Sequence, residues 1–101
     1  MTLTELRYIV AVARERHFGR AADACFVSQP TLSVAVRKLE EELNMQIFER
    51  TNTEVSMTSL GALIVDQAQR VLEEANSLKH LAMHGQDPRS EERRVGKECL
   101  R

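Results

Sequence analysis

The sequence is poor in aromatic residues, cysteine, proline and glycine, and each shortage excludes a class of protein. Its 101 residues include no Trp, one Tyr, three Phe, two Cys, two Pro and four Gly. Cys25 and Cys99 provide neither a disulfide framework nor the ligand spacing of a zinc site. No apolar run approaches the ~18 residues of a membrane span, and no signal peptide is recognisable. We therefore expect a cytoplasmic protein without a cofactor.

The chain also has almost no net charge. The formal charge is −1 at pH 7, so the total gives no indication of a polyanionic partner. Residues 1–88 hold nine Lys and Arg against twelve Asp and Glu, whereas residues 89–101 hold five against three. Any nucleic-acid site must therefore be a local basic patch. The residues available for it are Arg14, Arg16, Arg20, Arg37, Lys38 and Arg50.

What remains is typical of one small helical domain. Hydrophobic residues make up 43% of the chain and charged residues 29%, which suits a single aliphatic core. The sequence contains no Ser/His/Asp or Cys/His arrangement, no glycine-rich phosphate loop and no paired-carboxylate site, so we do not expect an enzyme. His80 and His84 are four residues apart, but a metal site would need a third ligand.

Two helices are predicted before residue 28. Thr2 and Glu5 form a capping-box pattern, and apolar residues then recur at helical spacing to about Glu15. Gly19 is expected to cap a short second helix. Its packing face would consist of small residues, Ala21, Ala22 and Cys25. Only a short link separates this helix from Ser28, which predicts a steep crossing of the kind found in a helix-turn-helix.

The segment 28–43 predicts the third helix, with Ser28 as N-cap and Pro30 in the first turn. Its buried face would comprise Leu32, Ala35, Val36, Leu39 and Leu43. The outward face carries Gln29, Pro30, Thr31, Ser33, Val34 and Arg37. These small polar groups, one amide and one guanidinium suit base edges and phosphates in a DNA groove, although a plain solvated face is the alternative.

A hairpin and a long helix are predicted after Asn44. Residues 47–50 and 55–57 read as two short strands around a polar turn. Thr58 would cap a helix that ends at Gly85. Within it, a heptad seam is formed by Ile64, Ala68, Val71, Ala75, Leu78 and Ala82. We expect self-association through this seam in preference to packing onto its own domain alone.

Several motifs occur in a fixed order along the chain. They are Phe18, Ala21-Ala22, residues 27–33, Leu39-Glu40, Leu43, Phe48-Glu49-Arg50 and residues 58–61. In this order and spacing they resemble the N-terminal DNA-binding domain of LysR-type transcriptional regulators, over residues 1 to about 85. Segments that are similar to the peroxide-sensing OxyR branch of that family are 16–18, 20–23, 28–33, 49–51 and 65–68.

The resemblance implies a mainly α fold, a winged helix-turn-helix with three helices and a two-stranded wing. Residues 1–58 would form this DNA-binding domain and residues 59–85 a linker and dimerisation helix, while a C-terminal effector domain is expected to be missing. The helix-turn-helix at 18–37 would read the major groove. Near bases or phosphates would lie Gln29, Pro30, Thr31, Ser33 and Arg37, and Arg50 at the base of the wing would meet the DNA backbone or minor groove.

The function implied is that of a sequence-specific, duplex-DNA-binding transcription regulator, responsive to hydrogen peroxide if the OxyR branch is right. The resemblance also implies a homodimer through the linker helix, and a tetramer of the full-length protein on an interrupted palindromic operator. The alternative is a helical protein-interaction or dimerisation module without DNA binding. Its outward helix face would be expected to carry Glu and Lys in place of Pro30, Ser33, Val34 and Arg37.

Some residues depart from the family pattern or have two interpretations. Phe26 and Asn44 stand where Gly is common, and Thr53 and Glu54 stand where wings of this branch often carry basic residues. Arg37 or Lys38 is placed either to contact phosphate or to pair with the acidic run 40–42. That run would repel DNA, so we expect the C-terminal half of its helix to point away from the duplex. Cys25 is expected to act as a small buried hydrophobe, not as a redox sensor.

The last residues are expected to lie outside the fold. Residues 86–101 lack apolar periodicity and predict a disordered tail. The stretch 89–99 resembles the in-frame translation of a commonly used sequencing-adapter oligonucleotide. We therefore expect this stretch not to be native, and we exclude it from the fold prediction.

Overall fold

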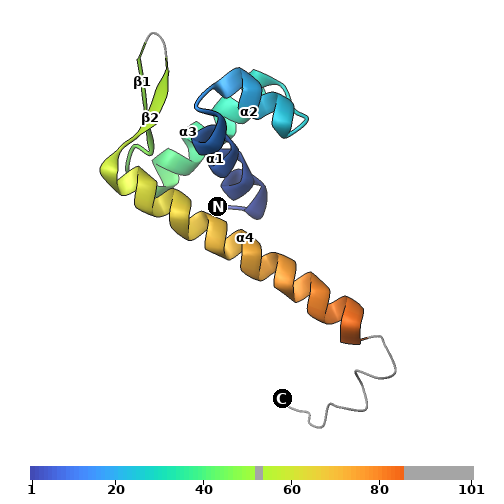
Figure 1. Ribbon diagram of the computed structural model, residues 1–101. Coiled ribbons are helices and arrows are strands. Elements are labelled where there is room, and N and C mark those ends of the chain that lie inside the picture. Colours follow the sequence, from blue (N-terminus) through green and yellow to red (C-terminus); the bar gives the residue numbers. More distant parts are fainter. Residues whose placement is uncertain (52–53, 86–101) are drawn as a thin grey trace.

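A bundle of three short helices carries a β-hairpin, and a long fourth helix runs away from it (Figure 1). The structure, a computed structural model, describes residues 1–51 and 54–85. The elements are α1 (Leu3–Glu15), α2 (Phe18–Ala24), α3 (Gln29–Leu43), β1 (Phe48–Arg50), β2 (Val55–Met57) and α4 (Ser59–Gly85). The strands pair antiparallel, with Glu49 opposite Ser56. The expected mainly α winged helix-turn-helix is confirmed, whereas the interpretations of Thr53 and of the tail 86–101 fall outside the described residues.

The first two helices begin at side-chain caps. The predicted capping box is present, because the Glu5 amide donates to Thr2 Oγ1 at 3.1 Å and the Thr2 amide donates to Glu5 Oε1 at 3.0 Å. The predicted cap of α2 at Gly19 is wrong. His17 is the N-cap, and its Nδ1 accepts the Arg20 amide at 3.0 Å. An imidazole nitrogen with a lone pair satisfies a helix N–H as a hydroxyl does, but histidine is not among the usual N-cap residues.

The turn between α2 and α3 has the hydrogen bonds of a Schellman motif. The Val27 amide donates to the Ala22 carbonyl at 3.0 Å, and the Phe26 amide donates to the Asp23 carbonyl at 3.1 Å. Phe26 therefore adopts a left-handed backbone with φ 61°, and its side chain is 94% exposed. Glycine usually occupies this position because a Cβ is strained there. Asn44 makes the corresponding turn after α3, with φ 56°, as expected for a residue that tolerates this geometry.

The core lies where α1, α2, α3 and the first half of α4 meet. Its buried residues are Leu6, Ile9, Ala11, Val12, Phe18, Ala21, Ala22, Leu32, Val36, Leu39, Ile47, Phe48, Val65 and Ala68. Of the predicted inner face of α3, Ala35 and Leu43 are only half-buried. Val65 was not expected in the core; it lies beside the predicted seam and packs into the bundle. None of the described helices has the length and apolar character needed to cross a membrane.

The base of the hairpin joins three elements through the backbone of Ile47. Glu40 Oε2, from α3, accepts the amides of Ile47 at 2.8 Å and Phe48 at 3.1 Å. The Ile47 carbonyl accepts the Thr58 amide at 3.0 Å, and Thr58 Oγ1 caps α4 by accepting the Gly61 amide at 2.9 Å. A Cβ on Gly61 would lie only 2.1 Å from the Ile47 carbonyl oxygen, so glycine is required there. Glu40 thus holds the wing in place, and the repulsion of DNA by the run 40–42 stays a prediction.

Replacing Phe26 by glycine should stabilise the protein. The left-handed backbone costs a non-glycine residue about 1–2 kcal/mol, and part of this gain is lost because glycine makes the unfolded chain more flexible. We expect Phe26→Gly to raise the free energy of unfolding by about 0.5–1 kcal/mol in urea titration. Phe26→Ala keeps the strained backbone and is the control. An equal gain in both variants would show that the exposed ring, not the backbone, is the source.

Removing the Glu40 carboxylate should destabilise the protein because two backbone amides lose their acceptor. We expect Glu40→Ala to lower the free energy of unfolding by about 2 kcal/mol. Glu41→Ala removes the same charge from an exposed position of the same helix and should change it by less than about 0.5 kcal/mol. Equal effects of the two variants in urea titration would contradict the assigned role of Glu40.

Candidate nucleic-acid interface

The N-terminal half of α3 presents a polar face to solvent. Ser28 caps the helix, with its Oγ accepting the Thr31 amide at 3.3 Å and donating to Thr31 Oγ1 at 2.8 Å. The side chains of Gln29, Pro30, Thr31, Val34 and Arg37 are exposed, and Ser33 is half-buried. The face therefore offers one amide, hydroxyl groups and one guanidinium within three helical turns. Such groups recognise base edges and phosphates.

Neither Arg37 nor Lys38 forms an ion pair with a described carboxylate. The pairing with residues 40–42 considered from the sequence is therefore not observed in this part of the chain. Glu40 binds the wing, as described above, and Glu42 Oε1 accepts the N-terminal ammonium of Met1 at 2.7 Å. Both basic side chains remain exposed and available for an anionic partner.

Arg50 at the end of β1 is held against the helix-turn-helix. Its guanidinium carbon lies 4.0 Å from the centroid of the Phe18 ring, a cation–π contact. Phe18 is buried and meets Phe48 edge-on at a centroid distance of 6.2 Å. The wing thereby places a cation beside the start of α2. Arg50 also lines the same surface concavity as Gln29 of α3.

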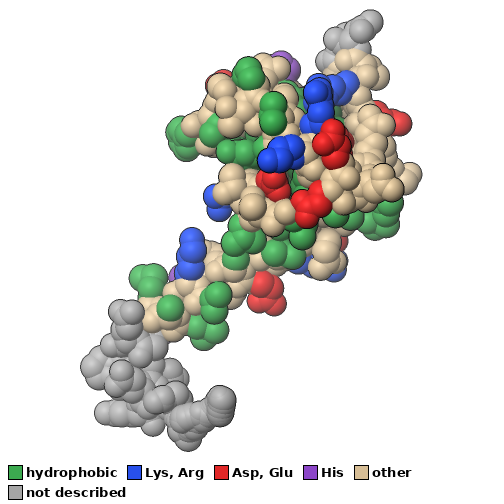
Figure 2. All heavy atoms as spheres, turned by 180° about the vertical axis from the view of Figure 1, so that it is seen from behind, with side chains coloured by type: hydrophobic (Ala, Val, Ile, Leu, Met, Phe, Trp, Pro, Cys, Tyr) green, Lys and Arg blue, Asp and Glu red, His purple; other side chains and the backbone are tan. Residues whose placement is uncertain are grey.

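The predicted seam of α4 is covered at one end and open at the other. Ala68 is buried against the chain's own core, and Ile64 and Ala75 are half-buried. Val71 and Ala82 are exposed, and Leu78 is 67% exposed. Figure 2 shows hydrophobic side chains along the protruding part of this helix. Beside Ala68 is an apolar cleft of about 230 Å³, and Met1, Leu6, Leu43 and Val71 are among the residues that line it.

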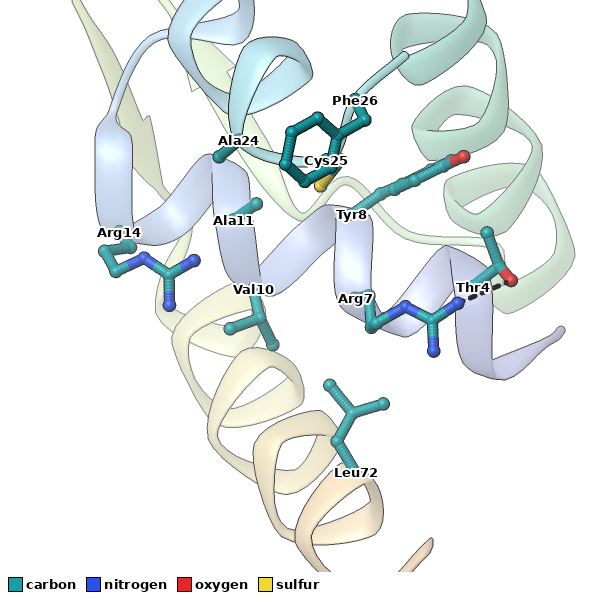
Figure 3. Close-up of a pocket in the computed structure, with 10 residues that line it drawn as sticks. All are labelled: Thr4, Arg7, Tyr8, Val10, Ala11, Arg14, Ala24, Cys25, Phe26 and Leu72. Carbon is teal, nitrogen blue, oxygen red and sulfur yellow. Dashed lines mark hydrogen bonds between the residues drawn. The ribbon is translucent and has the colours of Figure 1, made fainter. Parts of the chain in front are cut away.

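Cys25 lies in a second concavity, of about 460 Å³, between α1, the turn after α2 and Leu72 of α4 (Figure 3). It is half-buried, and this burial raises the pKa of its thiol, an effect that the charges of Arg14 and Arg7 partly oppose. A thiol with a raised pKa is a poor nucleophile. Its environment agrees with the expected role as a small hydrophobe. In the described part of the chain, no three His, Cys, Asp or Glu side chains gather as metal ligands.

Comparison with known proteins relates this chain to one family. The family model described as "Bacterial regulatory helix-turn-helix protein, lysR family" matches residues 3–62. The DNA-binding transcriptional dual regulator OxyR of Escherichia coli K12 is 54% identical over 82 residues, which are 81% of this chain and 27% of that protein. This chain therefore spans about a quarter of the length of that relative.

Two solved structures have the same fold. A full-length OxyR variant from Pseudomonas aeruginosa is 60% identical, with a TM-score of 0.83, over 86% of this chain and 30% of that chain. The BenM DBD, in a complex with catB site 1 DNA, is 34% identical, also with a TM-score of 0.83, over 86% of this chain and 97% of that chain. The expected resemblance to the OxyR branch is confirmed by these identities. The chain belongs to the LysR family of bacterial regulatory helix-turn-helix proteins.

Proposed function

We propose that this chain is the DNA-reading part of a LysR-family transcription regulator, and that it binds duplex DNA through α3 and the wing. The observation that carries the proposal is the exposed polar N-terminal face of α3, on a fold that matches nearly the whole of a domain solved together with DNA. Residues 1–58 would form the DNA-binding domain and residues 59–85 the linker helix. Gln29 and Ser33 are the candidates for base contacts, and Arg37 and Arg50 for phosphate contacts.

The signal to which the whole regulator responds is a further part of this proposal. The relatives that share about half of the aligned residues include OxyR of E. coli and a hydrogen peroxide-inducible genes activator of Haemophilus influenzae, which is 51% identical over 82 residues. We propose a response to hydrogen peroxide, carried by a C-terminal effector domain. We do not assign the response to the half-buried Cys25, because burial raises the pKa of its thiol and disfavours the reactive thiolate.

Base readout and phosphate contact predict different responses to mutation. Gln29→Ala should weaken binding to a duplex selected by the parent chain from a random pool by ~1–3 kcal/mol, and leave binding to random duplex unchanged. Arg50→Ala should weaken binding to both duplexes and flatten the salt dependence. Fluorescence anisotropy titrations at several salt concentrations measure the affinities for both duplexes and their salt dependence. Absence of any salt-dependent affinity in the parent chain would favour the alternative, a helical interaction module.

The seam of α4 has a size pattern that fits a second copy in antiparallel orientation. Large and small residues alternate along it: Ile64, Ala68, Val71, Ala75, Leu78 and Ala82. Antiparallel pairing about residue 73 places Ile64 against Ala82, and Leu78 against Ala68. Every layer then combines one large and one small side chain, which gives even packing along the seam. Parallel pairing would place Ala against Ala in alternate layers and leave voids.

The cleft beside Ala68 supports this pairing. In the antiparallel dimer, Leu78 of the second copy would enter the apolar cleft of about 230 Å³ between the seam and Leu6 and Leu43. Leu78 is exposed in the single chain and has no other partner there among the described residues. We therefore propose a homodimer through α4. Its two-fold symmetry would present the α3 helix of each copy, called the reading helix below, to one half of an interrupted palindrome. A tetramer is proposed only for the full-length regulator.

Cysteine cross-linking distinguishes the two orientations. In a chain whose native cysteines are replaced by serine, Ile64→Cys with Ala82→Cys should form a disulfide-linked dimer, whereas Ala82→Cys alone should not. Cross-linking by the single variant would indicate parallel pairing. In light scattering, Leu78→Glu should give a monomer. Leu63→Glu is the matched control, because Leu63 is 66% exposed on the same helix but lies outside the seam, and it should remain dimeric.

A further inference from the structure

We propose that the concavity between the wing and the start of α2 holds one phosphate of the DNA backbone. The inference rests on the DNA binding proposed above and adds Arg16 and His17 to the phosphate contact of Arg50. The concavity has a volume of about 260 Å³. Arg16, His17, Gln29, Arg50 and Glu54 are among the residues that line it. It therefore joins the reading helix, the wing and the link between α1 and α2 at a single place.

Its charge matches a phosphodiester. The two guanidinium groups of Arg16 and Arg50 and the carboxylate of Glu54 give the lining a net charge of +1 when the His17 ring is neutral. A phosphodiester in DNA carries a single negative charge, whereas a terminal phosphate carries more. Contacts of this kind position a protein on the duplex without reading its sequence. The site thus fits a backbone phosphate better than a free nucleotide.

Two of the donors are already held in place by the fold. His17 Nδ1 accepts the Arg20 amide at 3.0 Å, so the hydrogen of the neutral ring lies on Nε2 and can be donated to a phosphate oxygen. Arg50 rests at 4.0 Å on the ring of Phe18, which is buried against Phe48. Because these side chains are ordered before binding, less conformational entropy is lost when an anion binds.

Gly19 connects the phosphate site to base readout. A Cβ at this position would lie 2.9 Å from His17 Cε1 and 3.4 Å from Gln29 Oε1. The helical backbone at Gly19 would accept a side chain, but a methyl group there would have to displace the His17 ring. The gap lets the imidazole cap α2 while the Gln29 amide lies close by. Gly19 and His17 are positioning residues: a phosphate bound at His17 would set the register in which Gln29 meets a base.

The test is the salt dependence of binding to a random-sequence duplex by the full chain. The affinity falls as salt is added, and each lost phosphate contact makes the plot of log K against log salt less steep by about 0.9. We expect Arg16→Ala to make the plot less steep by about this amount. Arg70→Ala removes the same charge from α4, where Arg70 pairs with Asp66 at 2.9 Å, and should leave the slope at the parent value.

Gly19→Ala gives an independent readout, the ratio of affinities for a selected and a random duplex. We expect this ratio to fall at least threefold while the urea midpoint stays within a few tenths molar of the parent. A parent chain with no affinity for any duplex would overturn the proposed function itself. A parent that binds DNA, combined with an unchanged slope in Arg16→Ala or an equal loss in Arg70→Ala, would overturn the phosphate site alone.

Discussion

The backbone of Ile47 is the point on which the arrangement of the domain depends. Its amide is held by the Glu40 carboxylate of α3, and its carbonyl receives the Thr58 amide at the start of α4. The hairpin begins one residue later, and Gly61 allows α4 to pass against the same carbonyl. A two-stranded hairpin alone is only marginally stable in water, so its direction must come from such contacts. The junction therefore sets where the wing stands relative to the reading helix.

A second set of contacts aligns the groups proposed to meet DNA. Phe18 is shared between the core and the wing, because it packs on Phe48 and supports the guanidinium of Arg50. The preceding residue, His17, caps α2 and lies next to the space left by Gly19, close to Gln29. Base readout and phosphate contact are thus supported by three consecutive residues at the start of α2, His17, Phe18 and Gly19. This preorganisation lowers the entropic cost of binding.

Local rules predicted the elements well, and contacts between distant segments account for most of what was missed. Capping and periodicity placed α1, α3 and α4, as well as the turn at Asn44, because these signals act over a few residues. The places of Glu40 and Arg50 in the sequence did not reveal their contacts. Glu40 binds the backbone of a residue seven positions further on, and Arg50 rests on Phe18. The cap by His17 was missed because histidine is an uncommon N-cap. The seam of α4 and the DNA contacts of α3 remain predictions.

DNA binding through the N-terminal half of α3 and the adjoining concavity can be tested along the whole backbone. Backbone amide chemical shifts of the ¹⁵N-labelled chain, recorded while duplex DNA is added, test it residue by residue. We expect the largest changes at residues 16–19, 28–29, 31–34 and 50–51, with little change at Glu41, Glu42 and along α4. Changes confined to α4, or none at all at saturating duplex, would contradict it.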